Sequence, residues 1–184
     1  ADLQAIIART WQWVCHVEKL RKPGSYVTVN VAGMPVAVVR DRDNTLRAFY
    51  NVCKHRAHEL LQGEGRTTRI MCPYHAWGYN LSGELMMAPE TEHLDDFVPS
   101  DICLDQVHVE EFCGFIYVNL DPEARPLREV SGNLETEIKH WAPDIDQLTF
   151  GHRLTYDIKS NWKNVVDNFL ECYHCPTAHK DFCD

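Results

Sequence analysis

The sequence lacks a long hydrophobic run and an excess of positive charge. No run approaches the roughly 18 apolar residues that a membrane-spanning helix needs, and Asp2, Arg9 and His16 interrupt any signal-peptide core near the start. We therefore expect a cytoplasmic protein that has no membrane partner. The formal net charge of −9 argues against a nucleic-acid partner, because such partners bind basic surfaces.

Internal repeats and low-complexity segments are also absent. Cysteine and histidine, by contrast, are abundant, with 8 and 10 residues. Because the chain shows no secretion signal, metal binding or buried thiols are favoured over a disulfide framework. The sequence starts at Ala1 without a methionine and ends at Asp184 within a motif-rich segment, so we expect it to be incomplete.

Most of the sequence between Trp11 and Val118 has the pattern of short β-strands. Apolar residues alternate over short stretches that turn residues separate, such as Ser82-Gly83. Many short strands of this kind predict a small antiparallel barrel or sandwich. The expected strands cover residues 26–31, 35–39, 46–52 and 112–120, with a further turn at 41–44.

The pattern changes in the segment 121–145, where prolines bracket an expected helix near 132–141. A strand is expected at 150–158, and a strong amphipathic helix then begins at Asn161. The sequence therefore predicts an α+β fold in three parts. These are a helix/strand lead-in over 1–22, a β-rich domain over 23–122 and the incomplete start of a second domain over 123–184.

Four metal-binding side chains lie in two short segments, each where an expected strand gives way to a loop. Cys53-Lys54-His55 and Cys72-Pro73-Tyr74-His75 each supply one thiolate and one imidazole. Two Cys and two His suit a [2Fe–2S] centre in which Cys binds one iron and His the other. A structural Cys2His2 zinc site is the alternative, although zinc-finger spacing pairs Cys with Cys and His with His. Trp77 and Tyr79 are expected to pack over this centre or in the core.

The segments 51–56 and 72–77 resemble the two cluster-binding loops of the Rieske family. Ala57 and Ala76 stand where that family often has Gly, and both are small. Neither loop has a spare cysteine for the disulfide of respiratory Rieske proteins. The resemblance implies a [2Fe–2S] cluster whose ligands are Cys53, His55, Cys72 and His75.

A second constellation follows Asn161. Asp167, Glu171 and His174 have the spacing of one helix face, and Pro176 bends or restarts the helix so that His179 can return toward His174. Two histidines and a carboxylate form the facial triad of non-haem Fe(II) oxygenases, which leaves open positions for O2.

The same segment allows two other interpretations. Four of its residues have spacing compatible with a Cys3His zinc site: Cys172, Cys175, His179 and Cys183. A helix face rich in His and Glu can also simply be solvated.

Thiols that bind no metal are expected to be buried in apolar surroundings; they are Cys15, Cys103, Cys113, Cys172 and Cys175.

Residues 171–179 resemble the D/E-x2-H-x4-H motif of Rieske non-haem iron oxygenase α subunits. The resemblance implies that His174 and His179 bind a mononuclear Fe(II) and that Glu171 links it to a Rieske histidine of a neighbouring subunit. Asp167 is a further catalytic candidate. The third iron ligand of the family, a C-terminal carboxylate, has no match in this chain. The Glu form of the motif, with its Cys-Tyr-His-Cys-Pro run, resembles the branch that acts on quaternary amines such as betaines and carnitine.

The resemblance implies a β-rich Rieske domain followed by the start of a helix-grip-like catalytic domain. It also implies a terminal oxygenase that takes NAD(P)H electrons from a flavin/iron–sulfur reductase and uses O2 to oxidise a small organic substrate. The reaction would be N-demethylation or C–N cleavage of a quaternary amine, in a homo-oligomer that is commonly a trimer. The competing hypothesis is a Rieske ferredoxin-type electron carrier with a structural zinc appendage.

Overall fold

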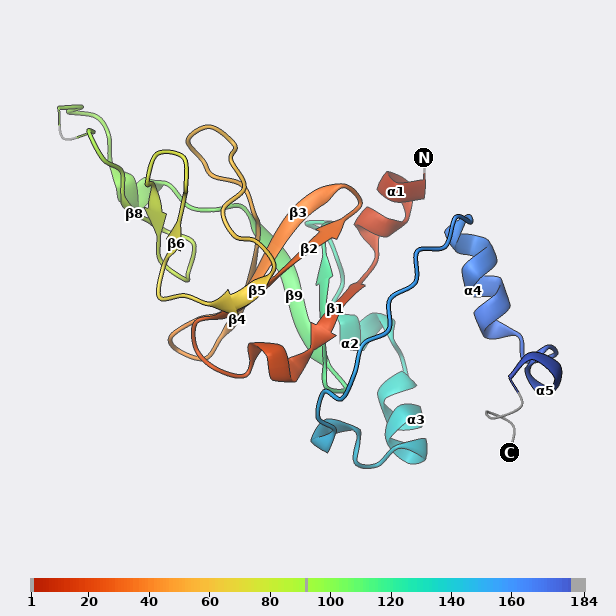
Figure 1. Cartoon of the computed structure of the whole chain (residues 1–184). Coiled ribbons are helices and arrows are strands. Elements are labelled where there is room, and N and C mark those ends of the chain that lie inside the picture. Colours follow the sequence, from red (N-terminus) through yellow and green to blue (C-terminus); the bar gives the residue numbers. More distant parts are fainter. Residues whose placement is uncertain (1, 92, 180–184) are drawn as a thin grey trace. The chain divides into compact units, whose positions relative to one another are not determined.

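The structure is a computed structural model that describes residues 2–91 and 93–179. The chain divides into two compact units, Ala1–Phe150 and Gly151–Asp184, whose elements are labelled in Figure 1. The boundary expected between residues 122 and 123 falls within the first unit, and the three-part division stays a prediction. Among the described residues, no helix is long and apolar enough to cross a membrane.

A curled antiparallel sheet of seven strands forms the centre of the first unit (Figure 1). Its strand order is β1-β10-β9-β4-β3-β2-β5, and the sheet accounts for most of the β structure expected from the alternating pattern. The bounds are β1 Gln12–His16, β2 Ser25–Val31, β3 Met34–Arg40, β4 Leu46–Tyr50, β5 Glu64–Arg66, β9 Gln106–Phe112 and β10 Phe115–Asn119.

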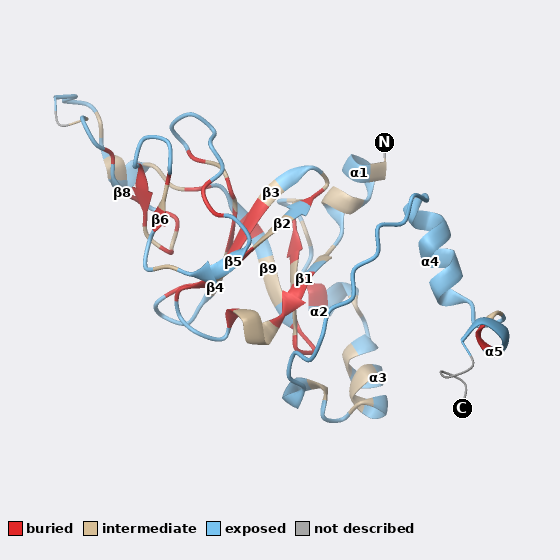
Figure 2. Ribbon diagram, viewed as in Figure 1, coloured by how far each residue is buried: buried red, intermediate tan, exposed pale blue. Residues whose placement is uncertain are grey.

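Strand β3 shows why the sheet is stable, because its side chains enter two hydrophobic cores. Ala37 and Val39 belong to one core, with Phe49, whereas Val36 and Val38 belong to the other. Successive side chains of a strand point to opposite faces, so a run of valines is buried on both sides. Figure 2 shows this strand as a buried segment of the sheet.

A second, three-stranded sheet has the order β6-β7-β8, with β6 Ile70–Met71, β7 Gly78–Tyr79 and β8 Leu85–Met87. Its hairpin β6–β7 presents the loop of residues 72–77. The turn between β7 and β8 requires glycine at position 83, where φ is +92° and an added Cβ would lie 2.7 Å from a ring carbon of Phe49. The small sheet thus packs tightly against the core that also surrounds Cys53 and Cys72.

The helices are short. They are α1 Asp2–Ala5, α2 Leu127–Val130, α3 Leu134–Trp141, α4 Trp162–Leu170 and α5 Cys175–Ala178, with 3-10 turns η1 Ile7–Arg9, η2 Val17–Leu20, η3 Pro99–Asp101 and η4 Ile145–Gln147. The helix expected near 132–141 is confirmed as α3, and the helix expected after Asn161 is confirmed as α4. Asn161 caps α4 through its side-chain oxygen, which accepts the N–H of Lys163 at 3.0 Å.

Two expected strands differ from the structure. The single strand expected at 112–120 is interrupted by a hairpin turn, because Cys113 and Gly114 both have positive φ (48° and 79°) and form the two-residue connection between β9 and β10. The strand expected at 150–158 is wrong: among the described residues, no strand pairs with this segment, and its alternating Leu154, Tyr156 and Ile158 are exposed. Alternation without a neighbouring strand does not make a sheet.

Candidate metal centres

The two Cys-His loops of the first unit have the same backbone hydrogen bonds. The N–H of Cys53 donates to the carbonyl of His58 (2.9 Å), and the carbonyl of Cys53 accepts from Ala57 (3.0 Å). In the second loop, the N–H of Cys72 donates to the carbonyl of Trp77 (2.8 Å), and its carbonyl accepts from Ala76 (3.0 Å). Each loop therefore folds back over its cysteine in the same way.

Both alanines of these loops have left-handed backbones, with φ of 55° at Ala57 and 57° at Ala76. Glycine adopts this conformation without a steric penalty, whereas a Cβ is disfavoured there. This geometry gives a physical reason for the glycines that the related loops often have.

The four expected cluster ligands lie near one another, and the two cysteines are buried whereas the two histidines are exposed. Cys53 and Cys72 are each 2% exposed, whereas His55 and His75 are exposed. The two imidazole rings face each other edge to face, with centroids 4.7 Å apart. Buried thiolates with outward imidazoles fit a [2Fe–2S] centre in which each iron takes one kind of ligand.

Tyr79 lies beneath this centre and is fully buried. Its hydroxyl oxygen accepts the backbone N–H of Lys54 (3.0 Å) and lies 3.3 Å from Cys53 Sγ. Burial, and next the hydrogen bond with Cys53, raise the pKa of the Tyr79 phenol above its ordinary value. The phenol therefore keeps its proton and can donate a hydrogen bond to a Cys53 thiolate.

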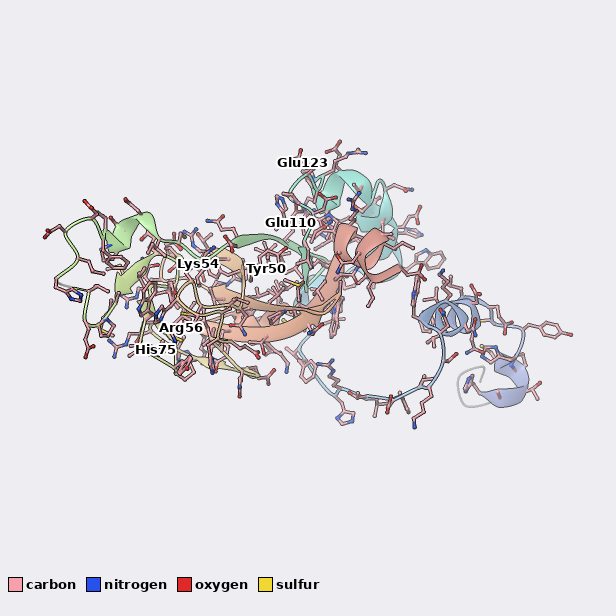
Figure 3. All side chains as sticks on the ribbon, turned by 90° about the horizontal axis from the view of Figure 1, so that it is seen from above. Tyr50, Lys54, Arg56, His75, Glu110 and Glu123 are labelled. Carbon is pink, nitrogen blue, oxygen red and sulfur yellow. The ribbon has the colours of Figure 1, made fainter. Side chains whose placement is uncertain are left out.

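The two histidines have aromatic neighbours. The Trp77 indole stacks on the His55 ring, with centroids 4.8 Å apart and an interplanar angle of 8°, while Tyr74 lies 3.9 Å from the His75 ring. Loss of hydration, and then repulsion from His55 and Arg56, lower the pKa of His75; Figure 3 labels Arg56 and His75. A neutral imidazole is the form that binds a metal.

The second unit holds the remaining expected ligands, but not on one helix face. Helix α4 ends at Leu170, and Glu171 has an extended backbone (φ −106°, ψ 136°), so the single face expected for Asp167, Glu171 and His174 is wrong. The break comes before Pro176, which instead stands in the first turn of α5. The restart expected between the two histidines is present.

Glu171, His174 and His179 lie together after this break. The His174 and His179 rings have centroids 5.4 Å apart, and Glu171 Oε1 lies 2.5 Å from His174 Nδ1. The other carboxylate oxygen accepts the N–H of Tyr173 at 2.7 Å. The contact with His174, followed by the bond from Tyr173, lowers the pKa of Glu171, which keeps the carboxylate charged beside the two rings.

A cavity of about 410 Å³ adjoins the two histidines. Its lining includes Glu171, Asn168 and both nearby cysteines, but not Asp167. Asn168 was not anticipated from the sequence, since no spacing rule singles it out. Cys175 is buried as expected, whereas the burial expected for Cys172 is wrong, because this thiol is exposed.

Within the ranges 2–91 and 93–179, no group of three or more His, Cys, Asp or Glu side chains is placed to hold one metal ion. A [2Fe–2S] centre takes two protein ligands on each iron. At the second site, His174 and His179 would supply two of the three ligands of a facial triad. Cys183, part of the alternative zinc set, lies outside the described residues.

Comparisons with known proteins match both parts of the chain. The family "Rieske [2Fe-2S] domain" matches residues 10–99, and "Ring hydroxylating alpha subunit (catalytic domain)" matches residues 145–183. The carnitine monooxygenase oxygenase subunit of Escherichia coli (strain K12) is 41% identical over 100% of this chain and 49% of that protein. The chloroplastic choline monooxygenase of Beta vulgaris is 33% identical over 97% of this chain and 41% of that protein.

The fold is also that of a solved relative. A quaternary ammonium Rieske monooxygenase, crystallised with L-carnitine, matches with a TM-score of 0.92 at 38% identity, covering 100% of this chain and 52% of that one. The chain thus spans about half the length of the curated carnitine enzymes it matches. These findings confirm the α+β fold class and the resemblance stated above. The chain belongs to the Rieske oxygenase α subunits, with a Rieske [2Fe–2S] domain followed by part of the ring-hydroxylating catalytic domain.

Proposed function

We propose that the whole protein is the terminal oxygenase of a two-site iron system. Cys53, His55, Cys72 and His75 hold the [2Fe–2S] cluster, and His174 and His179 hold a mononuclear Fe(II). The observation that carries this proposal is the pair of Cys-His loops with matching hydrogen bonds, followed in the same chain by two neighbouring histidines with a charged Glu171.

The chain's own residues prepare both sites. When bound, the cluster supplies single electrons and the mononuclear iron supplies a site for O2. The buried Cys53 and Cys72 keep solvent from the thiolate side, and Tyr79 donates a hydrogen bond to Cys53. Trp77 fixes the plane of the His55 ring by stacking. Glu171 orients His174, and we assign it the link to a Rieske histidine of a neighbouring subunit, with Asp167 as a further candidate.

The proposed substrate is a quaternary amine, oxidised by N-demethylation or C–N cleavage. Three relatives are named for carnitine, choline and glycine betaine, and each of these compounds carries a quaternary amine. The first proposed partner is a flavin/iron–sulfur reductase that uses NAD(P)H. The second is further copies of the chain, which form a trimer in the cytoplasm. A ferredoxin-type carrier would leave the catalytic-domain match over residues 145–183 without a role.

Metal analysis tests this proposal. The whole protein, prepared without oxygen and reconstituted with Fe(II), should contain three irons and two acid-labile sulfides per chain. His179→Ala should lose one iron and keep both sulfides, whereas Cys53→Ala should lose the sulfides. Two irons, two sulfides and one zinc in the unaltered protein would instead favour the electron carrier.

A further inference from the structure

Two cysteines flank the candidate iron ligand His174. Cys172 and Cys175 have C-x-x-C spacing, and the N–H of Cys175 donates to the carbonyl of Cys172 at 3.1 Å. This bond closes a four-residue turn, whose outer Cα atoms lie closer than about 7 Å. Disulfides usually join Cα atoms about 4.4–6.8 Å apart, so a turn of this kind is compatible with a bond between the two cysteines.

Both side chains also face the same space and differ in access. They line the cavity of about 410 Å³ beside the histidines. Cys172 is exposed and Cys175 is 8% exposed, and both are thiols in the structure. An accessible thiol next to a sheltered second thiol is the arrangement of redox-sensitive pairs, in which the second cysteine resolves the first oxidation product.

We propose that Cys172 and Cys175 form a reversible dithiol–disulfide pair that hydrogen peroxide oxidises and that controls metal retention by His174. In the first step, the O–O bond of peroxide breaks, Cys172 becomes a sulfenic acid and water leaves. In the second, the Cys175 sulfur displaces the sulfenic oxygen as a second water, and the S–S bond forms. Peroxide is reduced, the two thiols are oxidised, and a dithiol reductant reverses the change.

The disulfide acts on His174 through the backbone. His174 is the third residue of the turn and caps α5, where its carbonyl accepts the N–H groups of Thr177 (3.1 Å) and Ala178 (2.8 Å). An S–S bond closes a ring that contains this backbone, so the imidazole shifts relative to Glu171 and His179. This consequence rests on the proposed function, whereas the disulfide itself does not.

The test uses the whole protein, loaded with iron without oxygen and then treated with hydrogen peroxide. Peptide mass mapping should show a disulfide between Cys172 and Cys175. Retention of the mononuclear iron should fall by on the order of tenfold relative to Cys172→Ser, which cannot form the bond but shares any direct damage by peroxide. Cys103→Ser, which changes a half-buried thiol outside the turn, should behave like the unaltered protein. Dithiothreitol should restore iron binding.

Three results would overturn the inference: no disulfide, a disulfide that uses Cys183, or a Cys172–Cys175 disulfide with unchanged iron retention. Reduced protein that takes up no iron at His174 and His179 contradicts the proposed function instead. The disulfide map then decides the thiol pair separately, because it needs no iron.

Discussion

At the scale of single residues, the hydroxyl of Tyr79 has a measurable consequence. Hydrogen bonds to cluster sulfurs stabilise the reduced state and raise the reduction potential. Tyr79→Phe removes the bond to Cys53 Sγ and keeps the ring in the core. If the hydrogen bond is stronger in the reduced than in the oxidised state by about 1 kcal/mol, its loss corresponds to roughly 40 mV for one electron. The reduction potential of the variant should therefore fall by about that amount in a spectroscopic redox titration.

A matched control exists in Tyr26, which packs against the same core. Its hydroxyl donates to the carbonyl of Gln62 at 3.5 Å and not to a cysteine. Tyr26→Phe should leave the potential unchanged. Equal shifts in the two variants would mean that the change at Tyr79 reflects general repacking and not the sulfur contact.

Asp41 gives a prediction about pH. Burial alone would raise its pKa, but bonds from Ser82 Oγ (2.7 Å), the Arg42 N–H (2.6 Å) and Arg47 Nε (2.7 Å) outweigh burial, so the pKa lies below its ordinary value. A depressed folded-state pKa gives stability that is present above the unfolded pKa of about 3.9 and lost as pH falls through the folded value.

Urea unfolding of the Asp41→Asn variant should therefore show a loss of about 1–3 kcal/mol near neutral pH, and a smaller loss below pH of about 4. Asp43, which is more exposed and 3.7 Å from Arg47, provides the control. Asp43→Asn should change the unfolding free energy by less than about 1 kcal/mol. A pH-independent difference for Asp41→Asn would contradict the assignment of its charge.

At the scale of elements, the cluster loops depend on their left-handed alanines. Ala57→Val adds a β-branched side chain at φ 55°, which should distort the loop and lower cluster content, measured as iron and visible absorbance. Ala57→Gly is the matched variant and should retain the cluster. Removing the Cβ relieves a steric cost of about 1–2 kcal/mol for a left-handed backbone, and this gain roughly offsets the conformational entropy that Gly adds to the unfolded chain. Full cluster content in the Val variant would show that this backbone conformation is not required.

The success of sequence-based prediction also differed by element. Strands β2, β3 and β4 were foreseen because alternation and turns are local signals. The strand expected within the lead-in 1–22 is present as β1, whereas the segment 150–158 was wrongly assigned, because strand pairing depends on residues that are far apart in the sequence. The end of α4 at Leu170 was also unforeseen, since the helical spacing of Asp167, Glu171 and His174 continued past it. The ligand motifs needed only local spacing, whereas the contact of Tyr79 with Cys53 spans residues far apart in sequence and needed the fold.

At the scale of the whole molecule, the proposed role of Glu171 makes catalysis a property of an assembly. If the cluster of one chain serves the iron of another, then two differently defective chains should complement each other. Cys53→Ala lacks the cluster and His179→Ala lacks the mononuclear iron, so each alone should be inactive. Oligomers assembled from a mixture should regain substrate-dependent NAD(P)H oxidation in the presence of the reductase.

Adding Glu171→Gln to the mixture identifies the residue that makes this complementation work. The amide keeps the size and hydrogen-bonding capacity of the carboxylate but removes the charge that the lowered pKa preserves. Placed in the chain with the intact iron site, it should suppress the recovered activity while iron and sulfide contents stay the same. Placed in the His179→Ala chain, whose iron site is already lost, it should have no further effect. If activity recovers equally with either placement, electron transfer between chains does not require the Glu171 carboxylate. If no mixture recovers activity, electron transfer takes place within a single chain.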